Sequence, residues 1–329
     1  MKLSVIIGTR NRSFAIKACI QSIGQAIVRA GLGDGDAEII IVDNGSTDDT
    51  AAIVSAMAGS SSIPVHLLLE PQTGVMRACN RGVRRGQGDL FVFTDDDCQM
   101  DEAYIVDLLA HDSADSDLVI RGGRIELGDP RDLPLTIKTD RTAMTFSLKL
   151  NSARKSCLSG QISGCNMTFR RSVYERLGPF DERFGPGAII GSGGDTDYIY
   201  RAYLAGIRIE YVPDMAVYHF HGRRDKALGH KVLQRYMIAN GALLAKYFWR
   251  HPNLFRSMYW DFKHLLKDAM RGRNTYLPDI GFSRADQMAC YLRGFFRYLL
   301  FAQGNPHFAV PADQAREKPL EPGSGKANG

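Results

Sequence analysis

The chain has 329 residues, of which 44% are hydrophobic and 23% charged, and its formal net charge is +5. This is the composition of an ordinary globular protein that is long enough to bury a substantial core in one or two domains. No segment approaches the roughly 18 uninterrupted apolar residues that a membrane-spanning helix needs, which excludes a span of that kind.

The first hundred residues alternate strands with helices. Apolar, β-prone runs predict strands at residues 3–7, 38–42, 65–69 and 90–93. Helices are expected at about 14–30, 49–57 and 74–85. This alternation predicts right-handed crossovers, a parallel sheet and helices on both of its faces, and hence an α/β fold.

The pattern changes after residue 100. Short helices are expected at 104–111, 172–177 and 195–205, and strands at 117–120, 123–127, 166–169, 207–212 and 217–221. The stretch 136–158 is expected to be helical. From His230 onward we expect three helices, at about 230–249, 254–271 and 284–302. The last twenty or so residues are rich in Ala, Pro, Gly and charge, and are expected to be disordered.

The cysteines and the N-terminus bear on the cellular compartment. The six cysteines include no CxxC pair, which indicates reduced thiols and argues against a zinc site. The first apolar run is too short for a signal peptide and is interrupted at residues 9–12. We therefore expect a cytoplasmic protein. Cys98 could bind a soft metal, but we expect it to be a small buried side chain of the core.

Three consecutive carboxylates, Asp95, Asp96 and Asp97, follow the apolar strand 90–93. In an open α/β sheet, ligands bind just outside the carboxyl ends of the strands. Clustered carboxylates repel one another unless a cation lies between them, and hard ions such as Mg²⁺ commonly bridge a carboxylate to a phosphate. The alternative is an acidic turn in which Asp97 or Asp101 caps the following helix.

Six segments in this order and at this spacing resemble the family 2 glycosyltransferases, which have the GT-A fold. The segments are residues 4–12, 41–48, 74–82, 88–97, 178–182 and 194–206. The resemblance implies a Rossmann-like, mostly parallel sheet flanked by helices. It also implies inverting transfer of a sugar from a UDP- or GDP-linked donor to a saccharide, lipid-linked or other hydroxyl acceptor, in polysaccharide or glycoconjugate biosynthesis.

The domains follow from the same resemblance. Residues 1–225 would form the GT-A domain, with a nucleotide-binding half at 1–100 and an acceptor half at 101–225. Residues 226–305 would form a basic, aromatic helical extension, and residues 306–329 a disordered tail.

The resemblance assigns donor contacts to the ends of the early strands. Asp43 would accept hydrogen bonds from a nucleobase or a ribose, although it could instead cap a helix. Thr9 and Arg12 would line the same pocket, and Arg77 would reach it from the third helix. Asp95 and Asp96 would contact the donor as well.

The metal, Mg²⁺ or Mn²⁺, would be held on the donor diphosphate by Asp97 and Asp95. His219 and His221 lie two apart on a predicted strand and therefore share a face. In some relatives a histidine at the end of this strand completes the metal shell. A structural histidine is the alternative for both.

The catalytic base of the family is the Asp of a Glu-Asp pair, which here reads Gly194-Asp195. Asp195 is the expected base, with Asp197 as the fallback, and the Glu is missing. Asn166 and Gly194 are expected on the acceptor side. We expect the acidic side chains of Asp43, Asp97 and Asp195 to surround one cavity, and the glycine-rich segment 185–194 could form a lid.

The C-terminal helices between residues 230 and 300 carry twelve Lys or Arg against four Asp or Glu, together with both tryptophans. Basic, aromatic helices favour the anionic surface of a bilayer, which would suit a lipid-linked acceptor. Packing on the core or on another subunit is the alternative, and nothing suggests nucleic acid as a partner.

There are three alternatives to this function. A degenerate member could bind nucleotide sugars without transferring them, as the missing Glu would allow. A sugar-phosphate nucleotidyltransferase is disfavoured, because the segment after the first strand lacks a glycine-rich, lysine-containing loop. A Rossmann dehydrogenase is disfavoured for want of a GxGxxG motif.

Overall fold

The structure is a computed structural model that describes residues 3–33, 35–148, 158–249, 251–270, 277 and 280–302. The strands are β1 Leu3–Thr9, β2 Ala37–Asp43, β3 Val65–Leu69, β4 Leu90–Phe93, β5 Cys98–Met100, β6 Val119–Leu127, β7 Met144–Phe146, β8 Met167–Arg170 and β9 Arg208–His219. The helices are α1 Ile16–Arg29, α2 Thr50–Ala58, α3 Val75–Arg85, α4 Tyr104–Ser113, α5 Arg171–Leu177, α6 Gly194–Leu204, α7 Lys226–Tyr247, α8 Arg256–Met270 and α9 Arg284–Arg297.

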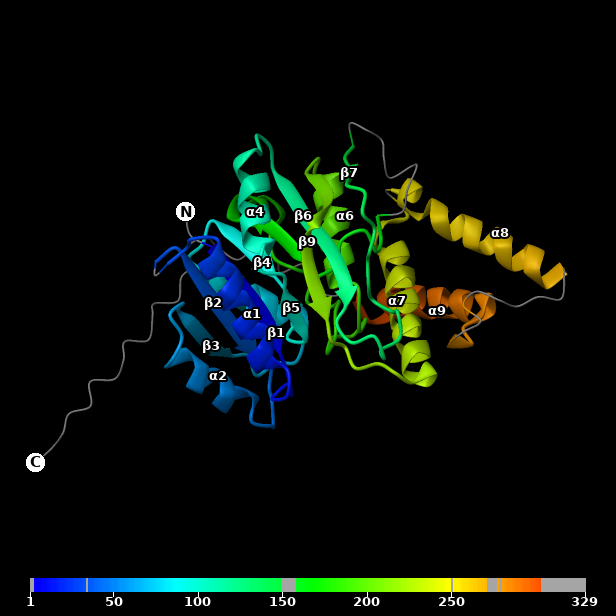
Figure 1. Cartoon of the computed structure of the whole chain (residues 1–329). Coiled ribbons are helices and arrows are strands. Elements are labelled where there is room, and N and C mark those ends of the chain that lie inside the picture. The colour runs from blue at the N-terminus through cyan, green and yellow to red at the C-terminus, as the bar shows by residue number, and fades with distance from the viewer. Residues whose placement is uncertain are drawn as a thin grey trace, which may run out of the picture.

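The strands of the described residues form one sheet in the order β3–β2–β1–β4–β8–β6–β9–β5, with β7 beside β9 (Figure 1). The strands β3, β2, β1 and β4 are parallel, as predicted. The strand β8 runs antiparallel to β4 and β6, whereas β6 and β9 are parallel. The mostly parallel sheet of an α/β fold is therefore confirmed, and the antiparallel β8 lies at its centre.

Successive apolar residues of the strands pack into hydrophobic clusters on opposite faces of the sheet. Ile6 and Ile40 belong to the hydrophobic cluster shared with α3 and α6. Val5 and Ile39 belong to the cluster shared with α1, α2 and α4. Because successive strand side chains point to opposite faces, these uninterrupted apolar runs can be covered by helices on both sides.

The structure corrects three predictions in the second half of the chain. The predicted helix at 136–158 does not form over residues 136–148, where β7 pairs with β9, and residues 149–157 lie outside the described part. The strands predicted at 117–120 and 123–127 are the single strand β6. The two strands predicted on either side of Pro213 are also one strand, β9, and the register between β6 and β9 shifts at Gly123/Arg124. A bulge of this kind accommodates Pro213, which has no N–H to donate.

The helices α7 and α9 pack closely against each other and against the sheet domain. Ala239, Ala242 and Leu243 of α7 belong to the core cluster that contains α3 and α6. A side chain at Gly294 would overlap the backbone carbonyl oxygen of Ile238, which explains the small residue at this crossing. The helix α8 projects beyond α7 and α9, away from the sheet (Figure 1). Among the described residues, none of the helices has the length and apolarity that crossing a membrane would require.

The predicted disordered tail, residues 306–329, lies outside the described residues.

Candidate active site

The carboxyl ends of β2, β1 and β4 lie side by side and carry polar residues. Thr9 is the register partner of Asp43, and its buried hydroxyl has no hydrogen-bond partner among the described residues. The Oδ1 atom of Asp43 accepts a hydrogen bond of 2.8 Å from the backbone N–H of Ser46, which fixes the turn after β2. The predicted donor residues Thr9, Asp43 and Asp96 are thus neighbours at one edge of the sheet.

The loops after β1 and β2 are tied to each other. The backbone N–H of Thr47 donates to the side-chain oxygen of Asn11 at 2.8 Å, and the backbone N–H of Arg12 donates to the hydroxyl of Thr50 at 2.8 Å. Asn11 has a φ of 55°, a left-handed conformation that asparagine tolerates better than most residues. This bracing holds Arg12 over the carboxylates that follow β4.

Arg12 bridges two of the three carboxylates. Its Nε atom lies 3.1 Å from Asp96 Oδ1, and its terminal nitrogen lies 3.3 Å from Asp97 Oδ2. Burial raises the pKa of Asp96 to about 6 against the opposing charge of Arg12, and it raises the pKa of Asp95 as well. Burial has the same tendency at Asp97, but the hydrogen bond and charge of His219 outweigh it and lower the pKa of Asp97. The pKa of Asp97 therefore shifts in the opposite direction from those of Asp95 and Asp96.

Asp95, Asp97 and His219 form a group that fits a divalent cation. One ligand atom from each lies within 4.8 Å of the others. The Nε2 atom of His219 is 3.2 Å from Asp97 Oδ1. Two carboxylates with one imidazole suit Mn²⁺ better than Mg²⁺, which prefers oxygen ligands alone. The residues predicted to hold the metal are therefore brought together, with the exception of His221.

His221 serves the neighbouring loop. Its Nε2 atom lies 3.1 Å from the Leu133 carbonyl oxygen, and its Nδ1 atom accepts a hydrogen bond from the backbone N–H of Arg223. Burial lowers the pKa of His221, as does the charge of His219. His221 does not belong to the group of ligand atoms formed by Asp95, Asp97 and His219, and its role as a metal ligand stays a prediction.

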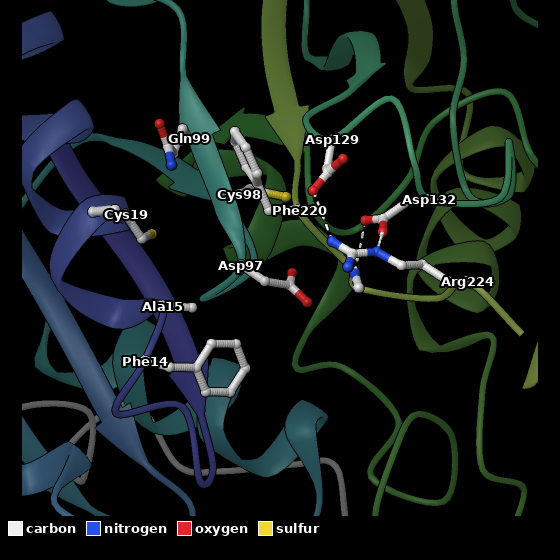
Figure 2. A pocket seen from close by; sticks show the side chains of 12 residues that line it. Phe14, Ala15, Cys19, Asp97, Cys98, Gln99, Asp129, Asp132, Phe220 and Arg224 are labelled. Carbon is white, nitrogen blue, oxygen red and sulfur yellow. Dashed lines mark hydrogen bonds and ion pairs between the residues drawn. The ribbon is translucent and has the colours of Figure 1, made fainter.

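Asp97 borders a cavity of about 310 Å³ between α1, β5 and the segments that contain Asp129 and Arg224. Figure 2 shows Asp97 between Phe14 and the guanidinium of Arg224. Arg224 donates to Asp129 at 2.7 Å and to Asp132 at 3.1 Å. The cavity is therefore lined by three carboxylates, of which Asp129 and Asp132 pair with Arg224, and by the rings of Phe14 and Phe220.

Asp195 lies at the first turn of α6 and faces a second cavity of about 240 Å³. Its Oδ2 atom accepts a hydrogen bond of 2.8 Å from the backbone N–H of Gly164, and its Oδ1 atom accepts one of 2.7 Å from Thr196. These two donors fix the orientation of a carboxylate that remains half-exposed. The side chains of Lys138 and Tyr236 border the same cavity.

Neither of these two cavities is bordered by all three of Asp43, Asp97 and Asp195, which were expected to surround one cavity. Asp97 and Asp195 border different cavities, and Asp43 borders neither of these two. The residue between them is Thr136, which lines the second cavity and whose hydroxyl lies 3.3 Å from Nδ1 of His219. One row of contacts, Asp97–His219–Thr136, thus runs from the first cavity to the second.

Asp195 is linked to the metal group through residues 164 and 165. The N–H of Gly164 donates to Asp195 at 2.8 Å, and the thiol of the next residue, Cys165, lies within 4.8 Å of a ring nitrogen of His219. The buried thiol of Cys79, on α3, has a pKa raised to about 12 by burial, and the charges of both Asp95 and Asp195 add to the shift.

Two residues of this region were missed by the sequence reasoning. Arg223 donates to the Thr136 hydroxyl at 3.2 Å, and its charge helps to lower the pKa of Asp97. Its position, four residues after His219 and just past the end of β9, is a usable signal for Arg223. Thr136 has a φ of 56°, which is rare for a β-branched residue, and no sequence pattern marked it.

Asp197, the fallback base, has a structural role. It is fully buried and binds Lys246, Arg201 and the hydroxyl of Tyr247, the last at 2.7 Å. Lys246 also pairs with Asp181 at 2.8 Å, so that this network joins α6 to α7. An acceptor hydroxyl cannot reach Asp197, and the assignment as a fallback base is wrong.

The two residues predicted on the acceptor side are also structural. Asn166 is buried and donates to the carbonyl oxygens of Arg124 and Met215, while it accepts from the Tyr104 hydroxyl at 2.7 Å. Gly194 is buried, and a side chain there would overlap Met76. This contact gives a physical reason for the missing Glu.

Arg77 lies on the first turn of α3 and is held by Glu182 at 2.7 Å and by Gln72 at 2.8 Å. The glycine-rich segment 185–194 lies against the start of the same helix, where the N–H of Val75 donates to the Pro186 carbonyl at 2.9 Å. This segment is ordered by contacts with α3, and its role as a lid stays a prediction.

Comparison with known proteins identifies the family. The structure resembles GT-A glycosyltransferases in its mostly parallel sheet and its flanking helices. The model described as glycosyl transferase family 2 matches residues 4–178, which is more than half of the chain. The chain belongs to glycosyl transferase family 2.

Among curated relatives, Glycosyltransferase AglE of Haloferax volcanii is 27% identical over 220 residues, 66% of each protein. The PGL/p-HBAD biosynthesis glycosyltransferase of Mycobacterium tuberculosis is 27% identical over 192 residues, 55% of this chain and 64% of the relative. The chain thus matches slightly less than two thirds of the length of these relatives.

Two solved structures show the same fold. Mannosyltransferase PcManGT from Pyrobaculum calidifontis, in complex with GDP-Man and Mn2+, has a TM-score of 0.56 at 19% identity and aligns over 92% of this chain and 88% of that one. TarS 1-349 from S. aureus, in complex with UDP-GlcNAc, has a TM-score of 0.54 at 19% identity, over 82% and 78% of the two chains. At these identities the likeness establishes the fold alone.

Proposed function

We propose that the chain is an inverting, metal-assisted glycosyltransferase that uses a nucleotide-diphosphate sugar, UDP- or GDP-linked, as its donor. The observation that carries the proposal is the group of Asp95, Asp97 and His219 at the carboxyl end of β4, to which Asp195 is linked through Gly164 and Cys165. Family membership supports it, and so do the nucleotide sugars and the Mn2+ in the named structural neighbours.

Donor binding would use the edge formed by β2, β1 and β4. Asp43 and Thr9 would contact the nucleoside, and Arg12 and Arg77 would supply positive charge for the diphosphate. Mn²⁺ or Mg²⁺ held by Asp95, Asp97 and His219 would neutralise the charge that develops on the leaving diphosphate. Because Asp96 already shares Arg12 with Asp97, it would tune this site without being a ligand.

Transfer would proceed by direct displacement. The acceptor hydroxyl oxygen attacks the anomeric carbon, and the bond from that carbon to the diphosphate oxygen breaks with its electron pair leaving on the diphosphate. Asp195 would take the acceptor proton at the oxygen that faces the second cavity. The hydrogen bonds from Gly164 and Thr196 would hold its carboxylate in line. The second cavity, bordered by Lys138 and Tyr236, would receive the acceptor.

Hydrolysis of donors tests this function without knowledge of the acceptor. A panel of UDP- and GDP-sugars is incubated with the full chain and Mn²⁺, and release of the nucleoside diphosphate is measured. We expect slow, metal-dependent release from one donor, and its loss in Asp97→Asn. The control Asp117→Asn removes an exposed carboxylate on the surface and should leave the rate unchanged.

A nucleotide-sugar-binding protein without transfer activity is the second candidate. The separation of Asp97 and Asp195 into different cavities favours it, as does Gly194 in place of the Glu. Tight, metal-dependent binding of UDP or GDP with no release from any donor, and no transfer to saccharide or lipid-linked acceptors, would support this candidate over the enzyme.

We also propose that α8 contacts an anionic membrane surface, where a lipid-linked acceptor would lie. Tyr259, Phe262, Leu266 and Met270 recur at helical spacing and are all exposed, Met270 to 81%. The acidic side chains of this helix face α9, where Asp261 accepts a hydrogen bond from Tyr291 and Asp268 accepts one from Arg284.

The cations of α8 accompany the exposed aromatic side chains. Lys263 lies 5.1 Å from the ring centre of Tyr259 and 5.0 Å from that of Trp260. Mixed aromatic and basic surfaces of this kind favour anionic headgroups.

Vesicle sedimentation tests the surface. We expect binding to phosphatidylcholine vesicles that contain phosphatidylglycerol, weaker binding to phosphatidylcholine alone, and a severalfold loss in the double variant Phe262→Ser/Leu266→Ser. Val28→Ser removes an exposed apolar side chain from α1 and serves as the control. Equal binding by the double variant and this control would contradict the assignment.

A further inference from the structure

Two cysteines far apart in the sequence converge on His219. One ligand atom from each of Cys98, Cys165 and His219 lies within 4.8 Å of the others, and all three side chains are buried. The absence of a CxxC pair argued against a zinc site, but the fold assembles a Cys₂His group from three separate segments. Such a group has the ligand composition of sites for thiophilic ions such as Zn²⁺.

The framework around the three residues is rigid. Cys98 on β5 is the direct antiparallel partner of His219 on β9, so that their side chains lie on one face of the sheet. Cys165 lies in a turn closed by the hydrogen bond from the N–H of Asn166 to the Ser163 carbonyl, at 3.0 Å. The Asn166 side chain in turn is anchored by three hydrogen bonds to the core. Ligands that are held in this way lose little conformational freedom when they bind an ion.

We propose that Cys98, Cys165 and His219 form a second cation site, which takes a thiophilic divalent ion in competition with the hard-metal site of Asp95, Asp97 and His219. Tetrahedral coordination with Zn–S bonds of 2.3 Å separates ligand atoms by about 3.7 Å, so that a contraction of about 1 Å is sufficient. Two thiolates and one imidazole would neutralise the ion in a buried position. Cys98 borders the cavity of about 310 Å³, which gives the ion a route from solvent.

The competition follows from the shared imidazole. His219 belongs to both groups, and its Nε2 atom already lies 3.2 Å from Asp97. An ion held by the two thiolates would withdraw His219 from the hard-metal site. Binding of the ion to Cys165 would also shift the turn before Asn166, in which the N–H of Gly164 donates to Asp195. This inference rests on the proposed function only for its consequence, which is inhibition of transfer by thiophilic ions.

Cadmium absorption tests the site without any donor. The metal-free full chain is titrated with Cd²⁺ in the presence of a phosphine reductant, and the thiolate-to-cadmium charge-transfer band is recorded in the near ultraviolet. We expect the band to saturate at one equivalent. Removal of an outer-shell partner already weakens a metal site by about 10- to 100-fold, so Cys98→Ser and Cys165→Ser should each weaken Cd²⁺ binding by at least about 100-fold. Cys290→Ser, which changes a buried cysteine of α9, is the matched control and should keep the band.

Two measurements on the wild-type chain cover the case in which a variant does not fold. X-ray absorption of the zinc-loaded protein should give two sulfur ligands together with nitrogen or oxygen. The signal of free Mn²⁺ in electron paramagnetic resonance should rise when Zn²⁺ is added to the Mn²⁺-loaded chain, because Zn²⁺ displaces Mn²⁺.

A band that survives in both Cys98→Ser and Cys165→Ser, a zinc site without sulfur ligands, or the absence of any band would overturn the proposal and leave the cysteines as core side chains. Absence of Mn²⁺ binding alongside a normal cadmium band would contradict the proposed function while leaving this site intact.

Discussion

The two acidic residues on the first turn of α6 should respond to the same substitution in opposite ways. Asp195 is half-exposed and accepts hydrogen bonds from the backbone N–H groups of Gly164 and Thr196. Asp195→Asn keeps one of these acceptors and loses the other. The loss should cost about 1 kcal/mol of stability. The rate of transfer should fall by about 10²- to 10⁴-fold, because an amide cannot take the acceptor proton.

Asp197→Asn should show the reverse. Asp197 is fully buried and is the shared partner of Lys246, Arg201 and Tyr247. Without its charge, Lys246 retains Asp181 as its one ion-pair partner among the described residues. Breaking a buried ion pair by removal of one partner costs about 3–5 kcal/mol. We therefore expect a large loss of stability and, at a temperature where the variant is folded, a transfer rate close to that of the wild type.

Urea unfolding and transfer at saturating donor separate the two effects. Affinity for the donor should be nearly unchanged in both variants, since neither residue belongs to the edge formed by β2, β1 and β4. Full transfer by Asp195→Asn would refute its assignment as the base. A loss of transfer in folded Asp197→Asn, without loss of stability, would refute the structural role of Asp197.

Three further outcomes are expected. Thr136→Ala should weaken Mn²⁺ binding by about tenfold or more in a titration, because it removes the hydroxyl beside Nδ1 of His219. Thr136→Ser keeps a hydroxyl and should keep the affinity for Mn²⁺. Equal affinities of the two variants for Mn²⁺ would contradict the positioning of His219 by this hydroxyl. Gly294→Ala should destabilise the fold by about 1–3 kcal/mol, because its Cβ would overlap a backbone carbonyl of α7. Gly24→Ala in α1, where the space around the glycine is open, should instead stabilise the fold by up to about 1 kcal/mol. Similar urea midpoints for the two glycine variants would contradict the close contact of α7 with α9 at Gly294.

The pH dependence of stability should include a contribution from Glu38. Burial opposes ionisation of its carboxyl, but hydrogen bonds from His66, Gln87 and Ser4 outweigh burial and lower its pKa from 4.5 to about 2. Because the folded-state pKa is the lower one, this stabilisation is present above pH 4.5 and is lost as the pH falls through about 2. At pH 6 the free energy of unfolding of the wild type should exceed that of Glu38→Gln by about 2 kcal/mol, after allowance for solvent screening. This difference in the free energy of unfolding should narrow toward pH 2. A gap that stays constant with pH would contradict this.

The first half of the fold could be predicted from the sequence because its signals are local. Uninterrupted apolar runs marked β1 to β4, and the Asp run marked the edge at which β4 ends. The short strand β5 could not be found in this way, because its three residues pair with β9, more than one hundred residues later, and Met100 bonds to Ser22 of α1. The helix predicted over 136–158 failed because pairing of β7 with β9 overrode local propensity.

The residues of the site also differ in whether a local sequence signal marks them. The proximity of Asp97 and His219 could be predicted because Asp97 follows β4 and His219 ends β9, and their binding of a metal stays a proposal. The structural contacts of Asn166 could not be foreseen, because its partners, Tyr104, Arg124 and Met215, come from distant segments and engage both of its amide N–H groups and one lone pair of its oxygen. The contact between the side chains of Thr136 and His219, which separates the two cavities, has no signature in the sequence, since it depends on a loop with an unusual backbone conformation.

Calorimetric titration of UDP and GDP into the full chain, with and without Mn²⁺, tests the central claim most directly. We predict that one of the two nucleotides binds with a strong dependence on Mn²⁺, and that Asp97→Asn removes this dependence while Asp117→Asn keeps it. Binding that is equally strong without the metal, or no binding of either nucleotide, would contradict a metal-assisted diphosphate site at the end of β4.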